Sequence, residues 1–298
     1  MNRDLNQSRI LITGGAGFVG SNLAKKLIET YPKAFIVVLD NFYTGKSENL
    51  PESIEVVNAS TWQIEEYFPH TEGTFDIVYH FGEYSRIVSS FDDIDYVLKS
   101  NLHGTTRVLE MCRKWNAKLI YSASSSTFGN NGKDENLSPY AWIKSKTVEL
   151  IKNYNDWFDL SYEICYFFNV YGPGQIEKGD YATVIGIFER QYLEGKPLSV
   201  VSPGTQSRDF THVEDIVSGV IKATHSGLNR EWHLRSGSTY TILELANMFN
   251  HSIELIPERR GERFTAEDMS TDTEEVLDWK PKWSLKNYIT SKINKNEG

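Results

Sequence analysis

Three residues in the middle of the chain have side chains that can move a proton to and from a hydroxyl group. Ser138 and Pro139 predict a helix start, and Tyr140 and Lys144 lie four residues apart, on one face of that helix. A phenol has a reference pKa of about 10, and a neighbouring ammonium favours its ionised form. Such a phenol can take the proton of an alcohol whose carbon loses hydride, while Ser124 holds the alcohol oxygen. We interpret Ser124, Tyr140 and Lys144 as a catalytic set, against the alternative of a solvated helix pair.

A glycine-rich turn near the N-terminus indicates where an oxidising cofactor would bind. Residues 9–20, RILITGGAGFVG, combine an apolar strand with glycines at three-residue spacing, and an amphipathic helical pattern follows. A strand, tight turn and helix of this kind place phosphates on the unpaired N–H groups of the helix N-terminus. We expect Gly14, Gly17, Phe18 and Val19 to contact a dinucleotide. The alternative is an ordinary glycine connection between strand and helix.

An acidic residue after the second predicted strand indicates which dinucleotide is bound. Residues 35–39 form another apolar run, and Asp40 follows it about twenty residues after the last glycine of the turn. A carboxylate there accepts hydrogen bonds from the adenosine ribose hydroxyls and repels a 2′-phosphate. NAD is therefore predicted in preference to NADP. The polar turn containing Asn41, Thr44 and Gly45 is expected to fold over the adenosine end of the cofactor.

Strand and helix patterns alternate across residues 9–170, which predicts a Rossmann-type α/β fold with a doubly wound parallel sheet. The predicted strands are residues 10–12, 35–39, 54–57, 75–80, 118–122 and 162–168, with a long amphipathic helix over 92–115. Beyond residue 170 the strands are shorter and Pro/Gly turns are frequent. We therefore predict an NAD-binding domain over 1–170 and a smaller, mainly substrate-binding lobe over 171–298, from which some segments return to the sheet.

Two strand ends carry residues suited to a binding site. Phe81 and Gly82 follow the fourth predicted strand, where a small residue lets a cofactor approach the backbone. The fifth strand leads into the hydroxyl residues 124–127, at the edge where open α/β sheets bind ligands. His80 is expected to be a packed residue of the strand end rather than a catalyst.

The composition excludes several other classes of protein. With 40 acidic and 31 basic residues the net charge is −9, and the basic residues are scattered, so nucleic acid is not an expected partner. The polar N-terminus and the lack of a long apolar run predict a cytoplasmic protein without a membrane partner. The two cysteines are far apart in sequence, and the seven histidines lack metal-ligand spacing, so we expect neither a disulfide framework nor a bound metal.

Taken together, these motifs resemble a known family, the extended short-chain dehydrogenase/reductases of the NAD-dependent epimerase/dehydratase group, which act on nucleotide sugars. The resemblance covers nearly the whole chain. The matching segments are residues 13–20, 39–45, 101–105, 138–144, 168–173, 207–215 and 279–281. In combination they are highly specific for the family and poorly specific for the substrate.

The resemblance implies a substrate, further site residues and a partner. The substrate would be a nucleotide-diphosphate sugar, and Asn169, Arg208 and Arg259 would contact its diphosphate, a role that suits charge-assisted bonds from arginine. For Arg259 the alternative is a surface salt bridge or a loop cap. Asn101, with Phe81, Gly82, Tyr140 and Lys144, would belong to the cofactor site. The helices at 92–115 and 140–158 would pair with those of a second copy in a homodimer.

Residues 124–126 bear on the activity that the resemblance implies. Dehydratases of the family carry an Asp-Glu pair after the hydroxyl residue, and decarboxylating members keep the Glu, whereas this chain has Ser125 and Ser126. We expect Ser124, Ser125 and Ser126 to contact the substrate, and the activity to be 4-epimerisation of a UDP-sugar through a transient 4-keto sugar. The alternatives are a C4 dehydrogenase, a 4-keto reductase or a 4,6-dehydratase on a GDP- or CDP-sugar, and a non-catalytic NAD-binding sensor. Glu83 stands where small residues are usual, and a relocated acid is one interpretation of it.

Overall fold

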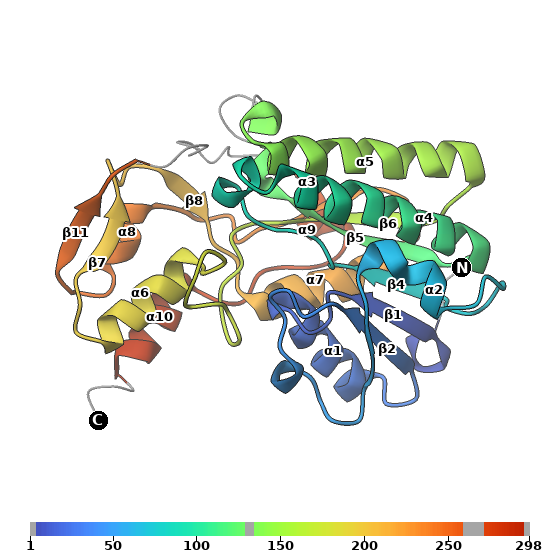
Figure 1. The fold of residues 1–298 in the computed structure, drawn as a ribbon. Coiled ribbons are helices and arrows are strands. Elements are labelled where there is room, and N and C mark those ends of the chain that lie inside the picture. The colour runs from blue at the N-terminus through green and yellow to red at the C-terminus, as the bar shows by residue number, and fades with distance from the viewer. Residues whose placement is uncertain (1–3, 129–133, 259–270, 295–298) are drawn as a thin grey trace.

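A computed structural model describes residues 4–128, 134–258 and 271–294 of the chain. In this part of the chain, seven parallel strands form one sheet in the order β3-β2-β1-β4-β5-β6-β9 (Figure 1). The strands are β1 (Arg9–Thr13), β2 (Phe35–Asp40), β3 (Glu55–Asn58), β4 (Ile77–His80), β5 (Lys118–Ser124), β6 (Tyr162–Phe167) and β9 (Glu231–Leu234). The predicted doubly wound fold is confirmed. Its strand order reverses between β1 and β4, where such sheets bind ligands.

Helices cover both faces of this sheet because its strands are apolar on both sides. On one face Ile10 and Ile12 of β1 pack in a core with Val217 and other residues of α1 (Phe18–Thr30) and α7 (Val213–Ser226). On the other face Leu11 packs in a core with Ile151 and other residues of α4 (Gly104–Trp115) and α5 (Pro139–Phe158). Because alternate residues of a strand point to opposite faces, β1 contributes to both cores.

The predicted helix over residues 92–115 is present but not uniform. It runs from α3 (Ile94–Val97) through a π-helical segment, Leu98–His103, into α4. Single π-helical turns within α-helices are frequent at functional sites. Here the segment includes Asn101, which is fully buried. A short helix, α2 (Ile64–Tyr67), precedes β4.

A smaller lobe lies beside the large sheet and has its own core (Figure 1). It contains the parallel pair β7 (Leu198–Val201) and β11 (Ile253–Ile256), the antiparallel pair β8 (Ser207–Asp209) and β10 (Thr239–Thr241), and the helices α6 (Val184–Leu193), α8 (Ile242–Asn247) and α10 (Leu285–Asn294). Phe188, Leu245, Phe249 and Ile289 pack at its centre. The short helix α9 (Thr273–Val276) contacts β9. The division at residue 170 stays a prediction, and α7 and β9 are later segments that pack with the large sheet.

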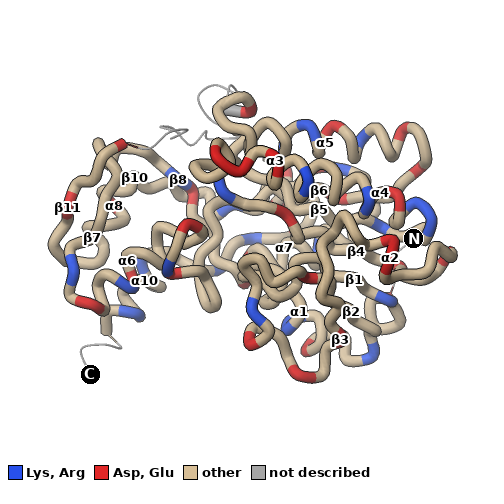
Figure 2. The backbone as a smooth tube through the Cα atoms, viewed as in Figure 1, with Lys and Arg blue, Asp and Glu red and all other residues tan. Residues whose placement is uncertain are grey.

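The surface features bear on partners. Figure 2 shows acidic and basic residues interspersed over both lobes. No helix in the described residues is both long enough and apolar enough to cross a membrane. Within the same residues, no cluster of His, Cys, Asp and Glu could hold a metal ion, and both cysteines are free and buried. Trp142 and Trp157 on α5 are exposed. The homodimer expected at α4 and α5 stays a prediction.

Candidate active site

A cleft of about 810 Å³ lies along the carboxyl ends of the parallel strands and extends to the smaller lobe. Most of the predicted site residues line it: Gly14, Gly17, Phe18, Val19, Asp40, Asn41, Thr44, Phe81, Gly82, Ser124, Ser125, Ser126, Tyr140, Lys144, Asn169 and Arg208. Gly45 and Asn101 are not among the lining residues, and Arg259 lies outside the described residues. The fold thus brings segments far apart in the sequence to one cleft, while the individual binding roles stay predictions.

The glycine turn is shaped by contacts that exclude any side chain. Gly14 has φ +68°, and a Cβ there would lie 2.6 Å from the backbone nitrogen of Gly82. A Cβ on Gly20 would collide with the Gly14 carbonyl oxygen. Helix α1 then begins after Gly17, which offers no side-chain cap, so its first N–H groups remain for a ligand.

We expect Gly14→Ala to reduce both stability and bound NAD. The substitution adds left-handed strain of about 1–2 kcal/mol and a clash with the Gly82 backbone. Gly73→Ala is a matched control, because Gly73 has φ +77° but nothing within 4 Å of the added Cβ. Thermal unfolding and the NAD content of the purified proteins measure the difference. Equal behaviour of the two variants would contradict a close approach of the turn to Gly82.

Asp40 lies at the carboxyl end of β2, and both of its carboxylate oxygens accept backbone hydrogen bonds. Ala16 N donates to Oδ2 and Phe42 N donates to Oδ1, each at 2.8 Å. Burial raises the pKa of this carboxyl, and the backbone hydrogen bonds oppose that shift. Each oxygen keeps a second lone pair for a ribose hydroxyl. The contact with ribose stays a prediction.

The turn after Asp40 packs against the glycine-rich loop at Ala16. Lys46 N, next to Gly45, donates to Ala16 O at 3.1 Å, and a Cβ on Gly45 would lie 2.9 Å from Ala16 Cβ. Asn41 Nδ2 donates to the side chains of Ser60, at 3.0 Å, and Tyr96, at 3.3 Å. The absence of a side chain at Gly45 therefore has a packing reason, apart from the predicted contact of this residue with the cofactor.

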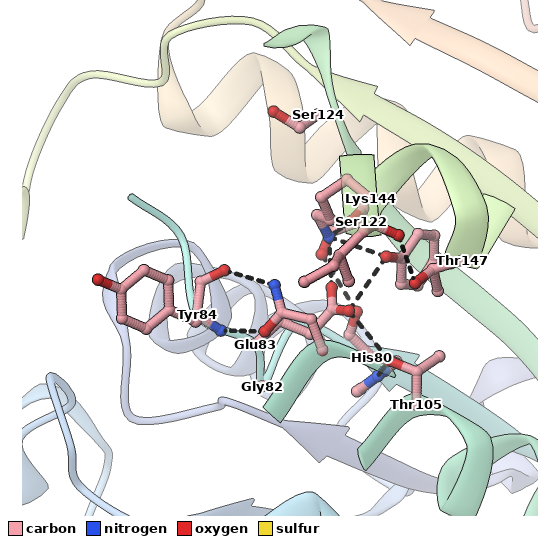
Figure 3. Close-up of polar contacts among 12 residues, drawn as sticks. His80, Gly82, Glu83, Tyr84, Thr105, Ser122, Ser124, Lys144 and Thr147 are labelled. Carbon is pink, nitrogen blue, oxygen red and sulfur yellow. Dashed lines mark hydrogen bonds and ion pairs between the residues drawn. The ribbon is translucent and has the colours of Figure 1, made fainter. Parts of the chain in front are cut away.

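Lys144 is held by three acceptors rather than by Tyr140. Its Nζ atom forms an ion pair with Glu83 and donates to Ser122 O and to Tyr121 OH, the last at 3.0 Å (Figure 3). An ammonium has three donors, so the protein uses all of them in this arrangement. The Lys144 and Glu83 side chains are only 5% and 3% exposed. All three donors of Lys144 are therefore directed at groups other than the Tyr140 hydroxyl, and Glu83 offsets its charge.

Glu83 also connects Lys144 to a buried chain of hydrogen bonds (Figure 3). Its Oε1 atom accepts from Thr105 Oγ1 at 3.0 Å and from Tyr121 OH at 3.1 Å, and Thr105 Oγ1 lies 2.8 Å from His80 Nε2. Burial raises the pKa of Glu83, and Lys144 opposes that shift. Burial lowers the pKa of His80 to about 3, so this imidazole is neutral at physiological pH. His80 is a packed residue, as predicted, and Glu83 is already engaged by three partners.

Tyr140 lies at the start of α5, where its ring lines the cleft. Ser138 caps the helix, since its side chain accepts from Ala141 N at 3.1 Å, and Pro139 occupies the first turn. Tyr140 is 7% exposed. The predicted helix start is confirmed. Tyr140 and Lys144 share one face of α5, and both line the cleft.

The run of hydroxyl residues 124–127 begins with the last residue of β5, Ser124. Strand β5 is two residues longer than predicted, because Ala123 and Ser124 pair with Tyr166 and Phe167 of β6. Ser124 Oγ accepts from Ser126 N at 3.2 Å, and the buried Ser126 hydroxyl has no hydrogen-bond partner among the residues that the structure describes. In Figure 3 no drawn interaction joins Ser124 to Lys144. The hydroxyls of Ser124 and Ser126 can therefore both bond to a ligand.

The predicted diphosphate contacts come from the junction with the smaller lobe. Asn169 follows β6 with φ +30°, and its Nδ2 atom donates to Asp209 O at 2.8 Å. Arg208, on β8, lines the cleft, and its Nη1 atom donates to Ser207 O at 2.8 Å. Asn169 thus joins the large sheet to the strand that carries Arg208. Their contact with a substrate stays a prediction.

The amide of Asn101 holds a loop rather than facing the cleft. Its Oδ1 atom accepts from Tyr84 N at 2.7 Å, and its Nδ2 atom donates to Tyr84 O at 2.8 Å. These two bonds fix the backbone directly after Glu83. A helix pattern reveals that such an amide is buried, but not which backbone it pairs with.

Sequence reasoning missed several other lining residues. Arg86 and Tyr84 follow Glu83 in the same loop, and Tyr181 comes from the smaller lobe. Tyr181 packs edge-on against Tyr43, at 5.7 Å between ring centres, and against Tyr84, at 5.5 Å. One sequence signal could have indicated them: aromatic residues such as these lie in predicted loops, where they are not needed to fill the hydrophobic core.

Comparison with known proteins agrees with this architecture. The model of the NAD dependent epimerase/dehydratase family matches residues 10–234. A Methanocaldococcus jannaschii protein provisionally named UDP-glucose 4-epimerase is 32% identical over 301 residues, covering 96% of this chain and 97% of that protein. UDP-glucuronic acid decarboxylase 3 of Arabidopsis thaliana is 30% identical over 302 residues, covering 93% and 86%. The structure of UDP-glucose 4-epimerase from Thermotoga maritima with UDP-glucose matches with a TM-score of 0.87 at 26% identity, covering 96% and 97%.

The fold and the cleft define an extended short-chain dehydrogenase/reductase, with a Rossmann sheet and a cleft lined by both a glycine turn and a Tyr-Lys pair. The chain belongs to the NAD-dependent epimerase/dehydratase family and is an enzyme of that family. Its cofactor is NAD. The residues present fit this group: the turn at Gly14 has no room for a side chain, α1 offers its N-terminus, and Asp40 disfavours a 2′-phosphate.

Proposed function

We propose that this enzyme is a nucleotide-sugar 4-epimerase that acts through a transient 4-keto sugar, with a UDP-sugar as the default substrate. The observation that carries the proposal is the composition of the cleft. Tyr140 and Lys144 face it from α5, and Ser125 and Ser126 stand where dehydratases of the family carry an acid and a base. A carbinol can be oxidised and reduced there, but no free carboxyl follows Ser124 to eliminate water.

The side chains of the cleft divide the work at the C4 hydroxyl of the sugar. NAD supplies a hydride acceptor and donor when it is bound. Tyr140 takes the hydroxyl proton as the carbinol is oxidised and returns it when the ketone is reduced. The Ser124 hydroxyl holds the same oxygen, and the Lys144 charge favours the phenolate. For inversion at C4, the keto sugar must turn over within the cleft before it is reduced.

The part of the cleft next to the smaller lobe favours a nucleotide-diphosphate sugar as the substrate. Arg208 and Asn169 line the cleft where the smaller lobe meets the large sheet. Relatives named for UDP-sugar substrates include both epimerases and a decarboxylase, so UDP is the default nucleotide. A second copy of the chain, packed on α4 and α5, is the proposed partner in solution.

The other candidate activities make different products. A C4 dehydrogenase or a 4-keto reductase would change the redox state of NAD, and a 4,6-dehydratase would release a 6-deoxy-4-keto sugar. Glu83 is the carboxyl group that such an elimination would need, but it is paired with Lys144 and bonded to Thr105 and Tyr121. A non-catalytic sensor would have no need for Tyr140 and Lys144 on one face of α5.

Product analysis by NMR separates these activities. The purified enzyme is incubated with UDP-, GDP- and CDP-sugars, without added cofactor, and the sugar signals are followed. We expect a mixture of axial and equatorial C4 epimers, with no net change in NAD. A free 4-keto or 6-deoxy product, or stoichiometric NADH, would replace the epimerase assignment with one of the alternatives.

A further inference from the structure

Arg86 lines the cleft, and its guanidinium has no carboxylate partner among the residues that the structure describes. Its Nε atom is buried and makes no hydrogen bond to any described residue, and its Nη1 atom donates to the adjacent Ser85 carbonyl at 3.3 Å. The Tyr181 ring lies 5.5 Å from the guanidinium carbon. A guanidinium has five donors, so most of those of Arg86 remain for a ligand.

Two hydrogen bonds fix the loop of Arg86 beside the catalytic tyrosine. Ser90 Oγ donates to Ile87 O at 2.6 Å, and the backbone nitrogen of Tyr140 donates to Ser90 Oγ at 3.3 Å. Burial lowers the pKa of Arg86, and Tyr140 is the foremost of the phenols that oppose this shift. Arg86 therefore lies at the reacting end of the cleft, near the position that the proposed function gives to C4 of the sugar.

The other basic residues of the cleft already have a counter-charge or a proposed ligand, whereas Arg86 has no carboxylate partner in the described part of the chain. Glu83 already offsets the charge of Lys144. Arg208 comes from β8 in the smaller lobe, where the diphosphate is proposed to bind. A cation that is partly removed from water is costly unless it is paired, so an anionic group of the ligand is the expected partner of Arg86.

We propose that Arg86 binds a carboxylate on the sugar ring, so that the substrate is a nucleotide-activated uronic acid. The inference rests on the proposed function, because it places C4 beside Tyr140. In a hexuronic acid the carboxylate carbon is attached to C5, the neighbour of C4, and therefore extends from the reacting end of the ring. The planar fork of a guanidinium matches a carboxylate with two parallel hydrogen bonds. Arg86 is thus a specificity-determining residue.

Binding to a catalytically disabled enzyme tests this inference. In the Tyr140→Phe background, calorimetry gives Kd values for UDP-glucuronate and for UDP-glucose. We expect UDP-glucuronate to bind about tenfold to a hundredfold more tightly, the range of one charge-assisted contact. Arg86→Ala and Arg86→Gln, each added to that background, should bring the ratio of the two Kd values close to one. Arg107→Ala is the control, because Arg107 is exposed and pairs with Glu65 at 3.5 Å on the surface.

Three results would overturn the carboxylate assignment. One is an unchanged ratio in both Arg86 variants. Another is an equal loss of affinity for both ligands, which would assign Arg86 to the diphosphate. The third is a loss of bound NAD, which would assign it to the cofactor. Because binding is measured without turnover, failure of the 4-epimerase assignment shows separately, in the NMR products of the wild-type enzyme.

Discussion

Tyr140→Phe is expected to lower turnover by about a hundredfold to ten-thousandfold, the usual contribution of a positioned acid or base. The substitution removes only the phenol oxygen, so the ring still lines the cleft and the backbone nitrogen still donates to Ser90. NAD content and nucleotide-sugar affinity should therefore change little. Steady-state kinetics with the preferred sugar, together with the NAD content of the purified variant, measure both parts of this prediction.

Tyr154→Phe is a matched control on the same helix. The Tyr154 hydroxyl donates to Glu110 Oε1 at 2.8 Å, and Tyr154 is not a lining residue of the cleft. Its removal is expected to leave turnover close to that of the wild type. If Tyr140→Phe and Tyr154→Phe had equal activity, the proton-transfer role of Tyr140 would be lost.

Glu83→Ala is expected to cost about 3–5 kcal/mol in the free energy of unfolding, because it leaves the buried Lys144 ammonium without its counter-charge. The hydroxyls of Thr105 and Tyr121 lose their acceptor as well. Denaturant unfolding of the wild type and the variant gives the difference. Glu149→Ala is the control, because Glu149 pairs with Lys146 on the exposed face of α5 and should unfold like the wild type.

Glu83→Gln separates the charge of Glu83 from its shape. The amide retains an acceptor and similar volume, but the Lys144 charge is no longer offset. We expect the rate of sugar oxidation to change, because the buried ammonium beside the cleft has lost its counter-charge, and we expect a smaller loss of stability than in Glu83→Ala. Wild-type kinetics in Glu83→Gln, together with normal stability of Glu83→Ala, would mean that Glu83 neither positions Lys144 nor offsets its charge.

Much of the secondary structure follows from local sequence patterns, because tertiary contacts here agree with the local conformational preferences. The strand containing residues 10–12, the glycines after it and Asp40 lie close together in sequence, and they form one βαβ unit as predicted. The start of α5 follows equally from Ser138 and Pro139, because capping is a local interaction. Strand β9 shows the limit of this reasoning, since its place beside β6 depends on the tertiary fold.

The site was harder to predict where its function depends on pairing between distant residues. Sequence spacing placed Tyr140 and Lys144 on one face, but it gave no sign that Lys144 bonds to Glu83 across 61 positions of the chain. The pairing of the Asn101 amide with the backbone of Tyr84, 17 positions away, likewise follows only from the path of a loop. Arg86 follows Glu83 in a segment where small residues are usual, but its own place in the cleft became visible only in the structure.

The fate of a deuterium label at C4 of the sugar tests the central claim most directly. The wild-type enzyme is incubated in ordinary water with its preferred nucleotide sugar, deuterated at C4, and the products are analysed by NMR. The account predicts that the deuterium is retained at C4 of the inverted epimer. Deuterium found at C6, deuterium lost to water, or the absence of any inverted sugar after prolonged incubation would contradict epimerisation by hydride removal and return at that carbon.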